Sequence, residues 1–256
     1  MTAAMYFGMQ GLGDHISANG LVRVLLKSFD NVVVPVWSTY HKTIEYMYRD
    51  CEKIIVKQII SGQELMGIFN LLEEIDLDTV FIIGSNLAED VKIYLKNKVT
   101  LIHYSFEELL NTYGNTYDCH QLYYLGAGVS FTDRFTEFYL QRDLERENNL
   151  FEQLSLNKVP YIFVHDDPAR GYRLQLSSSY TKEIRNDYHN LIFDYGKVIE
   201  EAKEVHCMES SFRCYIEALQ PKGSLFLHHY VRNTSPFIVN GNLAPGCSVK
   251  NWNVII

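Results

Sequence analysis

The chain lacks the features that mark several large classes of protein. Its 256 residues contain five scattered cysteines and no CxxC pair, which argues against a disulfide framework and against a zinc site. No basic region followed by an apolar core of signal length opens the sequence, and no apolar run approaches the length of a membrane span. We therefore expect a soluble, cytoplasmic protein with reduced thiols and no membrane span.

Positive charge is also in short supply. Lysine and arginine number 23 against 31 aspartates and glutamates, which gives a formal net charge of −8. A protein that holds nucleic acid on a basic face needs the opposite balance, so we expect no nucleic-acid partner. The hydrophobic content of 47% is ordinary for a globular protein, and the length suffices for one large domain or two small ones.

Familiar catalytic and cofactor motifs are missing as well. The sequence has no GxSxG nucleophile elbow and no HExxH metal motif. Gly8, Gly11 and Gly13 occur in the opposite order to the dinucleotide fingerprint GxGxxG, and the second predicted strand ends without an acid to hold a ribose. These absences argue against a serine hydrolase and against a nicotinamide or flavin oxidoreductase. We expect no cofactor and no bound metal.

The order of the predicted elements is that of an α/β protein. Apolar runs of strand length alternate with segments of helical period, which predicts parallel sheets covered by helices on both faces. The predicted strands are residues 3–7, 31–37, 53–60, 78–84, 99–103, 160–165, 190–193, 204–207 and 224–228. The predicted helices are residues 16–28, 42–49, 63–75, 87–98, 132–154, 197–203 and 211–219.

This order predicts two domains. Alternation lapses near residues 118–130 and resumes after a charged segment of helical period. We predict an N-terminal domain over 1–130, a connecting helix over 131–157 and a C-terminal domain over 158–256. The last stretch, 233–256, is loop-like and gives little structural signal.

The loop after the first strand is the most informative stretch, reading MYFGMQGLGDHI over Met5–Ile16. Its glycines let the backbone turn sharply and approach a ligand. Asp14 is placed to act as a general base on a hydroxyl, and His15 can share or replace that role. In the alternative interpretation, Asp14 merely caps the helix predicted to start near Ile16.

A second group of polar residues follows the strand at 160–165. His165, Asp166 and Asp167 come at its carboxyl end, where ligands bind in open α/β sheets. Arg170 and Arg173 lie just beyond, and guanidinium groups suit the oxygens of a diphosphate. Two alternatives remain: a surface turn in which Asp167 pairs with Arg170, and a magnesium site on the two aspartates.

The third group opens the predicted helix at 211–219. Ser210 and Ser211 offer hydroxyls and free backbone N–H groups to an anion, and Glu209 can accept the hydroxyls of a ribose or a sugar. The alternative is an ordinary serine N-cap.

Together these segments resemble glycosyltransferases of the GT-B fold, in which two Rossmann-like domains with parallel sheets face each other across a cleft. The GLGDH loop resembles the first-strand loop of heptosyltransferases, which implies that Asp14 is the base, with His15 as second candidate. The C-terminal half is similar to the donor domain of fucosyltransferase-like enzymes, although Asp166 and Asp167 stand where that family has HxRR. The residues that match its donor site are His165, Arg170, Ser210, Ser211 and Phe212.

The resemblance implies a metal-independent, inverting glycosyltransferase that moves a hexosyl or pentosyl group from a UDP- or GDP-sugar to a glycan or other hydroxyl acceptor. A nucleotide-sugar epimerase of the same fold and a non-catalytic nucleotide- or sugar-binding module are the alternatives. The expected donor-binding residues are Gly11, Gly13, His165, Arg170, Arg173, Glu209, Ser210, Ser211 and Phe212.

Overall fold

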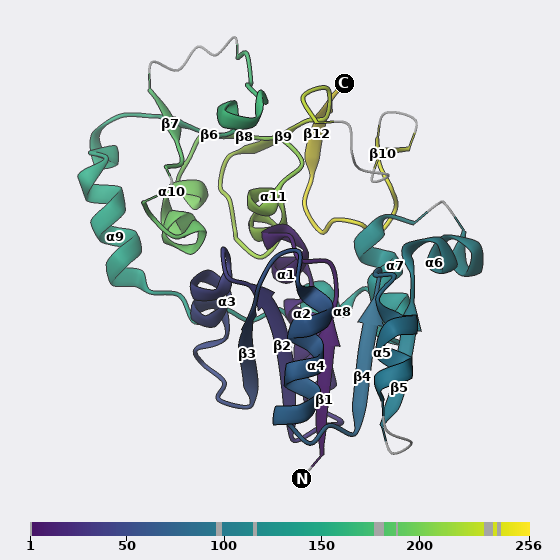
Figure 1. Cartoon of the computed structure of the whole chain (residues 1–256). Helices are drawn as coiled ribbons and strands as arrows, with labels where there is room; N and C mark the ends of the chain where they lie inside the picture. The colour runs from purple at the N-terminus through teal and green to yellow at the C-terminus, as the bar shows by residue number, and fades with distance from the viewer. Residues whose placement is uncertain are drawn as a thin grey trace. The chain divides into compact units, whose positions relative to one another are not determined.

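The computed structural model describes residues 2–95, 99–114, 117–176, 182–187, 189–232, 238–239 and 242–256. The chain divides into two compact units, Met1–Gln141 and Arg142–Ile256. Each unit contains a five-stranded sheet whose strand pairs are all parallel (Figure 1). The predicted α/β class with two parallel sheets is confirmed.

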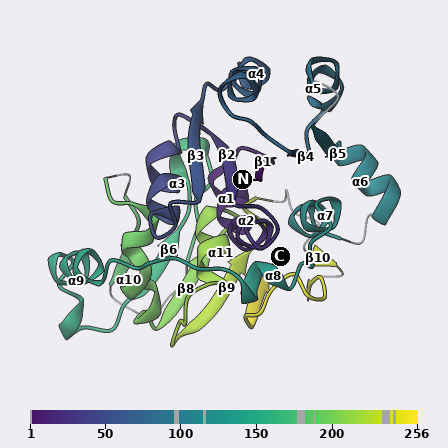
Figure 2. The same cartoon turned by 90° about the horizontal axis from the view of Figure 1, so that it is seen from below.

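The first unit is a doubly wound sheet in the order β3-β2-β1-β4-β5. Its elements are β1 (Ala3–Phe7), α1 (Leu12–Ser17), α2 (Asn19–Leu25), β2 (Asn31–Trp37), α3 (His41–Tyr48), β3 (Ile54–Ile59), α4 (Glu64–Glu74), β4 (Thr79–Ile83), α5 (Ala88–Tyr94), β5 (Thr100–Tyr104), α6 (Phe106–Tyr113), α7 (Cys119–Gly126) and α8 (Asp133–Thr136). Met5 of the central strand pairs with Val33 of β2 and Val80 of β4. Figure 2 shows α4 and α5 on one face of this sheet and α2 and α7 on the other.

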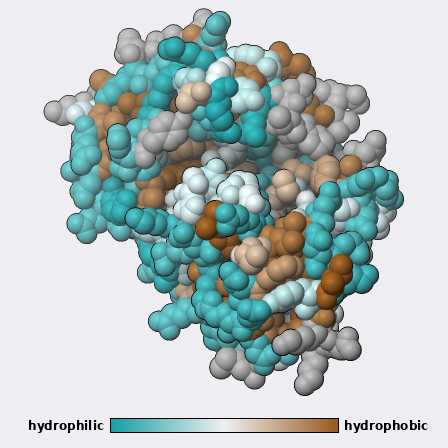
Figure 3. All heavy atoms as spheres, in the orientation of Figure 1, coloured by the Kyte–Doolittle hydropathy of each residue, from teal (hydrophilic) through white to brown (hydrophobic). Residues whose placement is uncertain are grey.

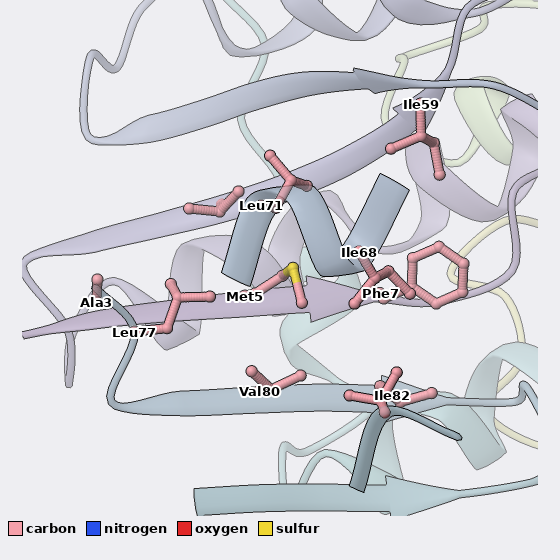
Figure 4. Packing of buried hydrophobic residues seen from close by; sticks show 11 residues of the cluster. Ala3, Met5, Phe7, Ile59, Ile68, Leu71, Leu77, Val80 and Ile82 are labelled. Carbon is pink, nitrogen blue, oxygen red and sulfur yellow. The ribbon is translucent and has the colours of Figure 1, made fainter. Parts of the chain in front are cut away.

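The core of the first unit fills the space between the sheet and α4. Met5 and Phe7 of β1 and Val80 of β4 lie on the same face as Ile68 and Leu71 of α4 (Figure 4). Burying an apolar side chain of this size stabilises a fold by roughly 1.5–3 kcal/mol. Because β1 and β4 are buried on both faces, their sequences are continuous apolar runs, and the strand after which the catalytic loop is predicted is firmly held.

The second unit has the sheet order β12-β9-β8-β6-β7. Its elements are α9 (Leu144–Gln153), η1 (Leu156–Lys158), β6 (Ile162–His165), η2 (Pro168–Arg170), β7 (Glu183–Arg185), η3 (Ile192–Tyr195), α10 (Gly196–Glu200), β8 (Glu204–Cys207), α11 (Ser211–Ile216), β9 (Ser224–His228), β10 (Ile238–Val239), β11 (Asn242–Leu243) and β12 (Trp252–Ile255). Phe163 of β6 packs on Phe212, so α11 covers the face of the sheet to which Phe163 points.

The edge strand β12 lies in the stretch that the sequence predicts as loop, so that prediction is wrong for this strand. Glu217, which follows α11 and is buried, accepts hydrogen bonds from Nε1 of Trp252 at 2.9 Å and from Oγ of Ser248 at 2.7 Å. Its other oxygen accepts the backbone N–H of Val249 at 3.1 Å. These contacts bring the C-terminal segment to β9. Within the same stretch, 233–237 and 240–241 lie outside the described residues.

The strand predicted at 190–193 is wrong as well. The end of this segment belongs to the 3-10 helix η3, and the sheet edge is formed instead by β7. The Asp194 carboxylate accepts the backbone N–H of Leu191 at 2.9 Å and forms a bidentate pair with Arg146. Side-chain bonds to the local backbone compete with sheet pairing and favour a turn.

The connecting helix predicted over 131–157 is interrupted: α8 and α9 are separated by non-helical residues. The backbone of Tyr139 does not bond along a helix, because its N–H donates to Oδ1 of Asn19 at 3.0 Å and its carbonyl accepts from Nδ2 of Asn19 at 3.1 Å. Asp143 then starts α9 by accepting the backbone N–H of Arg146 at 3.0 Å. Tertiary hydrogen bonds therefore replace the helical ones that the charge pattern suggests.

The helix predicted over 87–98 is α5, while 96–98 lie outside the described residues.

Most of the face in Figure 3 is hydrophilic, with apolar side chains gathered over α4 and α5, where Met66 and Ile93 are exposed. None of the helices among the described residues combines the length and the apolar character needed to cross a membrane.

Candidate functional site

Asp14 lies in the first turn of α1, directly after β1. The sequence places the helix start near Ile16, but α1 begins at Leu12, so Gly13 and Asp14 are inside it. Asp14 therefore does not cap a helix that starts near Ile16, because Gly11 is the N-cap of α1. As the third helical residue, Asp14 instead accepts the backbone N–H of Gly11 with Oδ2 at 3.1 Å. A Cβ on Gly11 would lie 2.5 Å from Oδ2 of Asp14, so a larger residue there would displace the Asp14 carboxylate.

Oδ1 of Asp14 contacts His120, a residue that the sequence interpretation missed. Oδ1 lies 3.1 Å from Nε2 of His120 on α7. The backbone N–H of His120 donates to Oδ1 of the buried Asp118 at 2.7 Å, which caps α7. Asp118 and Gln121 form a capping box, and this D-x-x-Q signature in the sequence marks the helix that presents His120.

The surroundings of Asp14 keep its carboxylate charged. Burial alone would raise the pKa of Asp14, but the hydrogen bond and charge of His120, with help from His15 and Gly11, hold that pKa below its ordinary value. About 26% of the Asp14 side chain is exposed. The neighbouring His15 is buried, and burial lowers its pKa to about 4. At neutral pH the loop therefore presents an ionised carboxylate beside a neutral imidazole.

Buried polar atoms without a partner gather on the same segment. Oε1 of Gln10, Nε2 of His15 and Oγ of Ser17 are all buried, and none has a hydrogen-bond partner among the described residues. Buried polar groups are nearly always hydrogen-bonded, so each of these atoms needs water or a ligand. Three such atoms within one loop and helix leave hydrogen bonds that water or a polar ligand would complete.

Among the described residues, Asp118, Cys119 and His120 have ligand atoms within 4.8 Å of one another, a spacing that a metal ion could use. Oδ1 of Asp118, however, already accepts the backbone N–H groups of His120 and Gln121, at 2.7 and 3.3 Å. Nε2 of His120 is bonded to Asp14. These atoms fit a helix cap and an Asp-His pair better than a metal centre.

In the second unit, His165 ends β6 and is buried against Phe212. The two rings lie 4.3 Å apart between centroids. Nδ1 of His165 is 2.7 Å from Oδ1 of Asn186, a residue that the sequence interpretation missed. An amide oxygen only accepts, so we assign the proton to Nδ1 and leave Nε2 as an acceptor. Burial lowers the pKa of His165 to about 4, which keeps the ring neutral.

The two aspartates after His165 are engaged with arginines of their own unit. Asp166 pairs with Arg185 and accepts the backbone N–H of Leu174 at 2.9 Å. Asp167 forms an ion pair with Nε of Arg170 at 2.5 Å, and 62% of the Arg170 side chain is exposed. The salt-bridged turn that the sequence allowed is therefore present. Arg173 is exposed nearby.

The serines precede or open α11 as predicted, with Ser210 at the N-cap position and Ser211 as the first helical residue. The helix has six residues rather than the predicted nine, so its dipole is weak. An anion at this place would depend mainly on hydrogen bonds from the serine hydroxyls and the backbone N–H groups. Glu209 lies 3.6 Å from Nε of the buried Arg213. Nη1 of Arg232 donates to the Glu209 carbonyl at 3.1 Å, which brings an unpredicted cation to this turn.

Comparison with known proteins identifies the fold. No protein-family model matches the sequence, and no curated protein matches it either. The ADP-heptose LPS heptosyltransferase II of E. coli has a similar structure, with a TM-score of 0.60 and 12% identity over 100% of this chain and 90% of that one. A family 9 glycosyl transferase from Veillonella parvula has a TM-score of 0.62 and 10% identity over 99% of this chain and 86% of that one. The chain has the GT-B fold.

Proposed function

We propose that the protein is a glycosyltransferase that moves a sugar from a nucleotide-sugar donor to a hydroxyl acceptor. The observation that carries the proposal is the Asp14 carboxylate, ionised and partly exposed, beside buried polar atoms that lack partners. A carboxylate in this state is suited to take a proton from a hydroxyl. The GT-B fold shared with two glycosyltransferases adds an argument from similarity of fold.

In this proposal Asp14 removes the proton of the acceptor hydroxyl as its oxygen bonds to the anomeric carbon of the donor. The bond from that carbon to the phosphate oxygen breaks on the opposite side, so the configuration inverts and a nucleoside diphosphate leaves. His15 is the second candidate for the base, but a pKa of about 4 makes its neutral ring a weak one. We assign it instead to hydrogen-bonding the acceptor.

The donor is proposed to bind in the C-terminal domain, 158–256, and the acceptor in the N-terminal domain, 1–130. The diphosphate needs cations or N–H donors to offset its charge, and arginines can supply them without a metal. Arg170 must then leave Asp167 for the phosphate. The donor-binding residues proposed in the C-terminal domain are His165, Arg170, Arg173, Glu209, Ser210, Ser211 and Phe212. Gly11 and Gly13 of the N-terminal domain are proposed to bind the donor as well.

UDP- and GDP-sugars remain the proposed donors. ADP-sugars belong in the test because the E. coli enzyme of similar structure is an ADP-heptose heptosyltransferase. A glycan is the proposed acceptor, in the setting of cytoplasmic glycan biosynthesis.

A thermal-shift screen against UDP, GDP, ADP, CMP and NAD, each with EDTA and again with magnesium, tests the donor site. A ligand at about 100 times its Kd stabilises the folded state by roughly 2.7 kcal/mol. Stabilisation by one nucleoside diphosphate in EDTA is the expected result, and a response to NAD alone would contradict the proposal.

The matching sugar nucleotide then separates the three candidate activities. A transferase releases the nucleoside diphosphate faster when an acceptor glycan is supplied. An epimerase converts the donor with no acceptor present, and a binding module never releases the nucleotide. Either of the last two outcomes would overturn the assignment as a transferase.

A further inference from the structure

The two oxygens of Asp14 are held by different parts of the first unit. Oδ2 accepts the Gly11 N–H at 3.1 Å, a bond within the same turn. Oδ1 contacts Nε2 of His120 at 3.1 Å, across 106 residues of sequence. A carboxylate oxygen retains a further lone-pair site after accepting one hydrogen bond, so both contacts leave room for a substrate hydroxyl.

The geometry places a hydrogen on Nε2 of His120. An ionised carboxylate can only accept a hydrogen bond, so Nε2 of His120 must carry the hydrogen that it donates to Asp14. Asp118 fixes the position of the ring on the side away from Asp14. Oδ1 of Asp118 accepts the backbone N–H of His120 at 2.7 Å and lies 3.7 Å from Nδ1 of the same residue. Asp118 is wholly buried as the cap of α7, which makes it a rigid anchor.

We infer that His120, anchored by Asp118, is the positioning residue that orients the Asp14 carboxylate and keeps it ionised for the transfer reaction. This inference rests on the proposed function, in which Asp14 is the base. His120 acts through Asp14 and does not itself receive the proton, since its Nε2 is already protonated. Asp14 gains the hydroxyl proton, and the Nε2–H of His120 continues to donate to the carboxyl oxygen.

The remaining titratable groups around Asp14 do not replace His120. His15 on α1 is neutral at working pH because burial lowers its pKa to about 4. Tyr6 on β1 and Tyr123 on α7 are neutral too, since burial raises the pKa of both phenols. Asp118 is itself a carboxyl group and offers no positive charge to Asp14. Among the interactions that lower the pKa of Asp14, the hydrogen bond from His120 is the largest, although burial opposes it.

Three variants separate positioning from mere packing. His120→Ala removes the donor, whereas His120→Gln keeps an amide N–H close to the position of Nε2. His103→Gln, on the edge strand β5, is the matched control for a histidine-to-glutamine change elsewhere in the same unit. If His120→Ala fails to fold, the comparison of His120→Gln with His120→Asn, whose shorter side chain cannot reach Asp14, provides the same test.

The first measurement needs no substrate: NMR titration of ¹³C-labelled aspartate carboxyl groups in the full chain, with the Asp14 signal assigned from Asp14→Asn. We expect the titration of Asp14 to move to higher pH in His120→Ala, to be largely restored in His120→Gln and to be unchanged in His103→Gln. An unchanged Asp14 titration in His120→Ala would overturn the inference, whatever the enzymatic activity.

The second measurement is the pH profile of nucleoside diphosphate release from the sugar nucleotide selected by the thermal-shift screen. The acid limb should move upward in His120→Ala, with kcat/KM on that limb falling roughly 10-fold or more, as expected for loss of a charge-assisted hydrogen bond. A uniform loss at every pH, with no rescue by His120→Gln, would contradict positioning. If wild-type protein releases no nucleotide from any donor, the proposed function fails while the titration result still stands.

Discussion

Asp14 in the first unit and Asp167 in the second both follow a buried strand, and both accept a backbone N–H of their own turn. Their other oxygens differ. Asp14 meets His120, which is distant in sequence, whereas Asp167 pairs with Arg170 three residues later. Oδ1 of Asp14 contacts an imidazole nitrogen and part of the Asp14 side chain stays exposed, whereas Asp167 pairs with a guanidinium of its own turn. The same strand-end position therefore carries a carboxylate with a long-range partner in one unit and a salt-bridged turn in the other.

The largest effect on stability is expected where charge is buried deepest. Arg213 in the second unit is fully buried between Glu209 and Glu217. Arg213→Ala leaves both carboxylates without that cation and should lower the free energy of unfolding by about 3–5 kcal/mol. Urea denaturation measures it. The exposed pair Lys222–Glu201 provides the control, since Lys222→Ala should cost less than about 1 kcal/mol. Equal effects would mean that burial does not distinguish these charges.

One buried histidine in each unit, His15 in the first and His165 in the second, makes stability fall as pH drops. Burial lowers the pKa of each to about 4, so between about pH 6.5 and 4 the unfolded chain binds protons that the folded chain does not. Each histidine should reduce the free energy of unfolding by about 2 kcal/mol from pH 7 to pH 5. Urea denaturation at the two pH values should show a smaller difference for His15→Gln. An unchanged difference would mean that His15 is accessible to protons in the folded state.

The smallest effect on stability is expected at the Asp167–Arg170 pair. Arg170→Ala should change the free energy of unfolding by less than about 1 kcal/mol, because the arginine side chain is 62% exposed. The Kd of this variant for the nucleoside diphosphate found in the thermal-shift screen should nevertheless rise roughly 10-fold, because the proposal has Arg170 leave Asp167 and bind the phosphate. Isothermal titration calorimetry measures this. An unaltered Kd would leave Arg170 as a surface turn residue only.

Continuous burial made much of the fold predictable. The bounds of β1 and β2 agree with the sequence prediction, because strands buried on both faces are largely apolar runs. The bounds of β8 and β9 agree with it as well. The edge strand β12 was not predictable in this way, since its position depends on Glu217, which is distant in sequence.

In the candidate site, too, the local contacts could be predicted from the sequence and the long-range contact could not. The Asp167–Arg170 pair spans three residues and was visible as an alternative, and the hydrogen bond from Gly11 to Asp14 is equally local. The contact between Asp14 and His120 joins β1–α1 to α7, a helix that the apolar period did not indicate. Local turn chemistry can be read from one segment, but a contact across 106 residues needs the fold.

Asp14→Asn tests the central claim most directly. The change keeps the size of the side chain and removes its ability to take a proton. Nucleoside diphosphate release in the presence of acceptor should fall by about 10²–10⁴-fold, while the Kd for the nucleoside diphosphate, measured by calorimetry on the same protein, stays within roughly twofold of wild type. Retained transfer, or an equal loss of transfer and nucleotide binding, would contradict the role of Asp14 as the base.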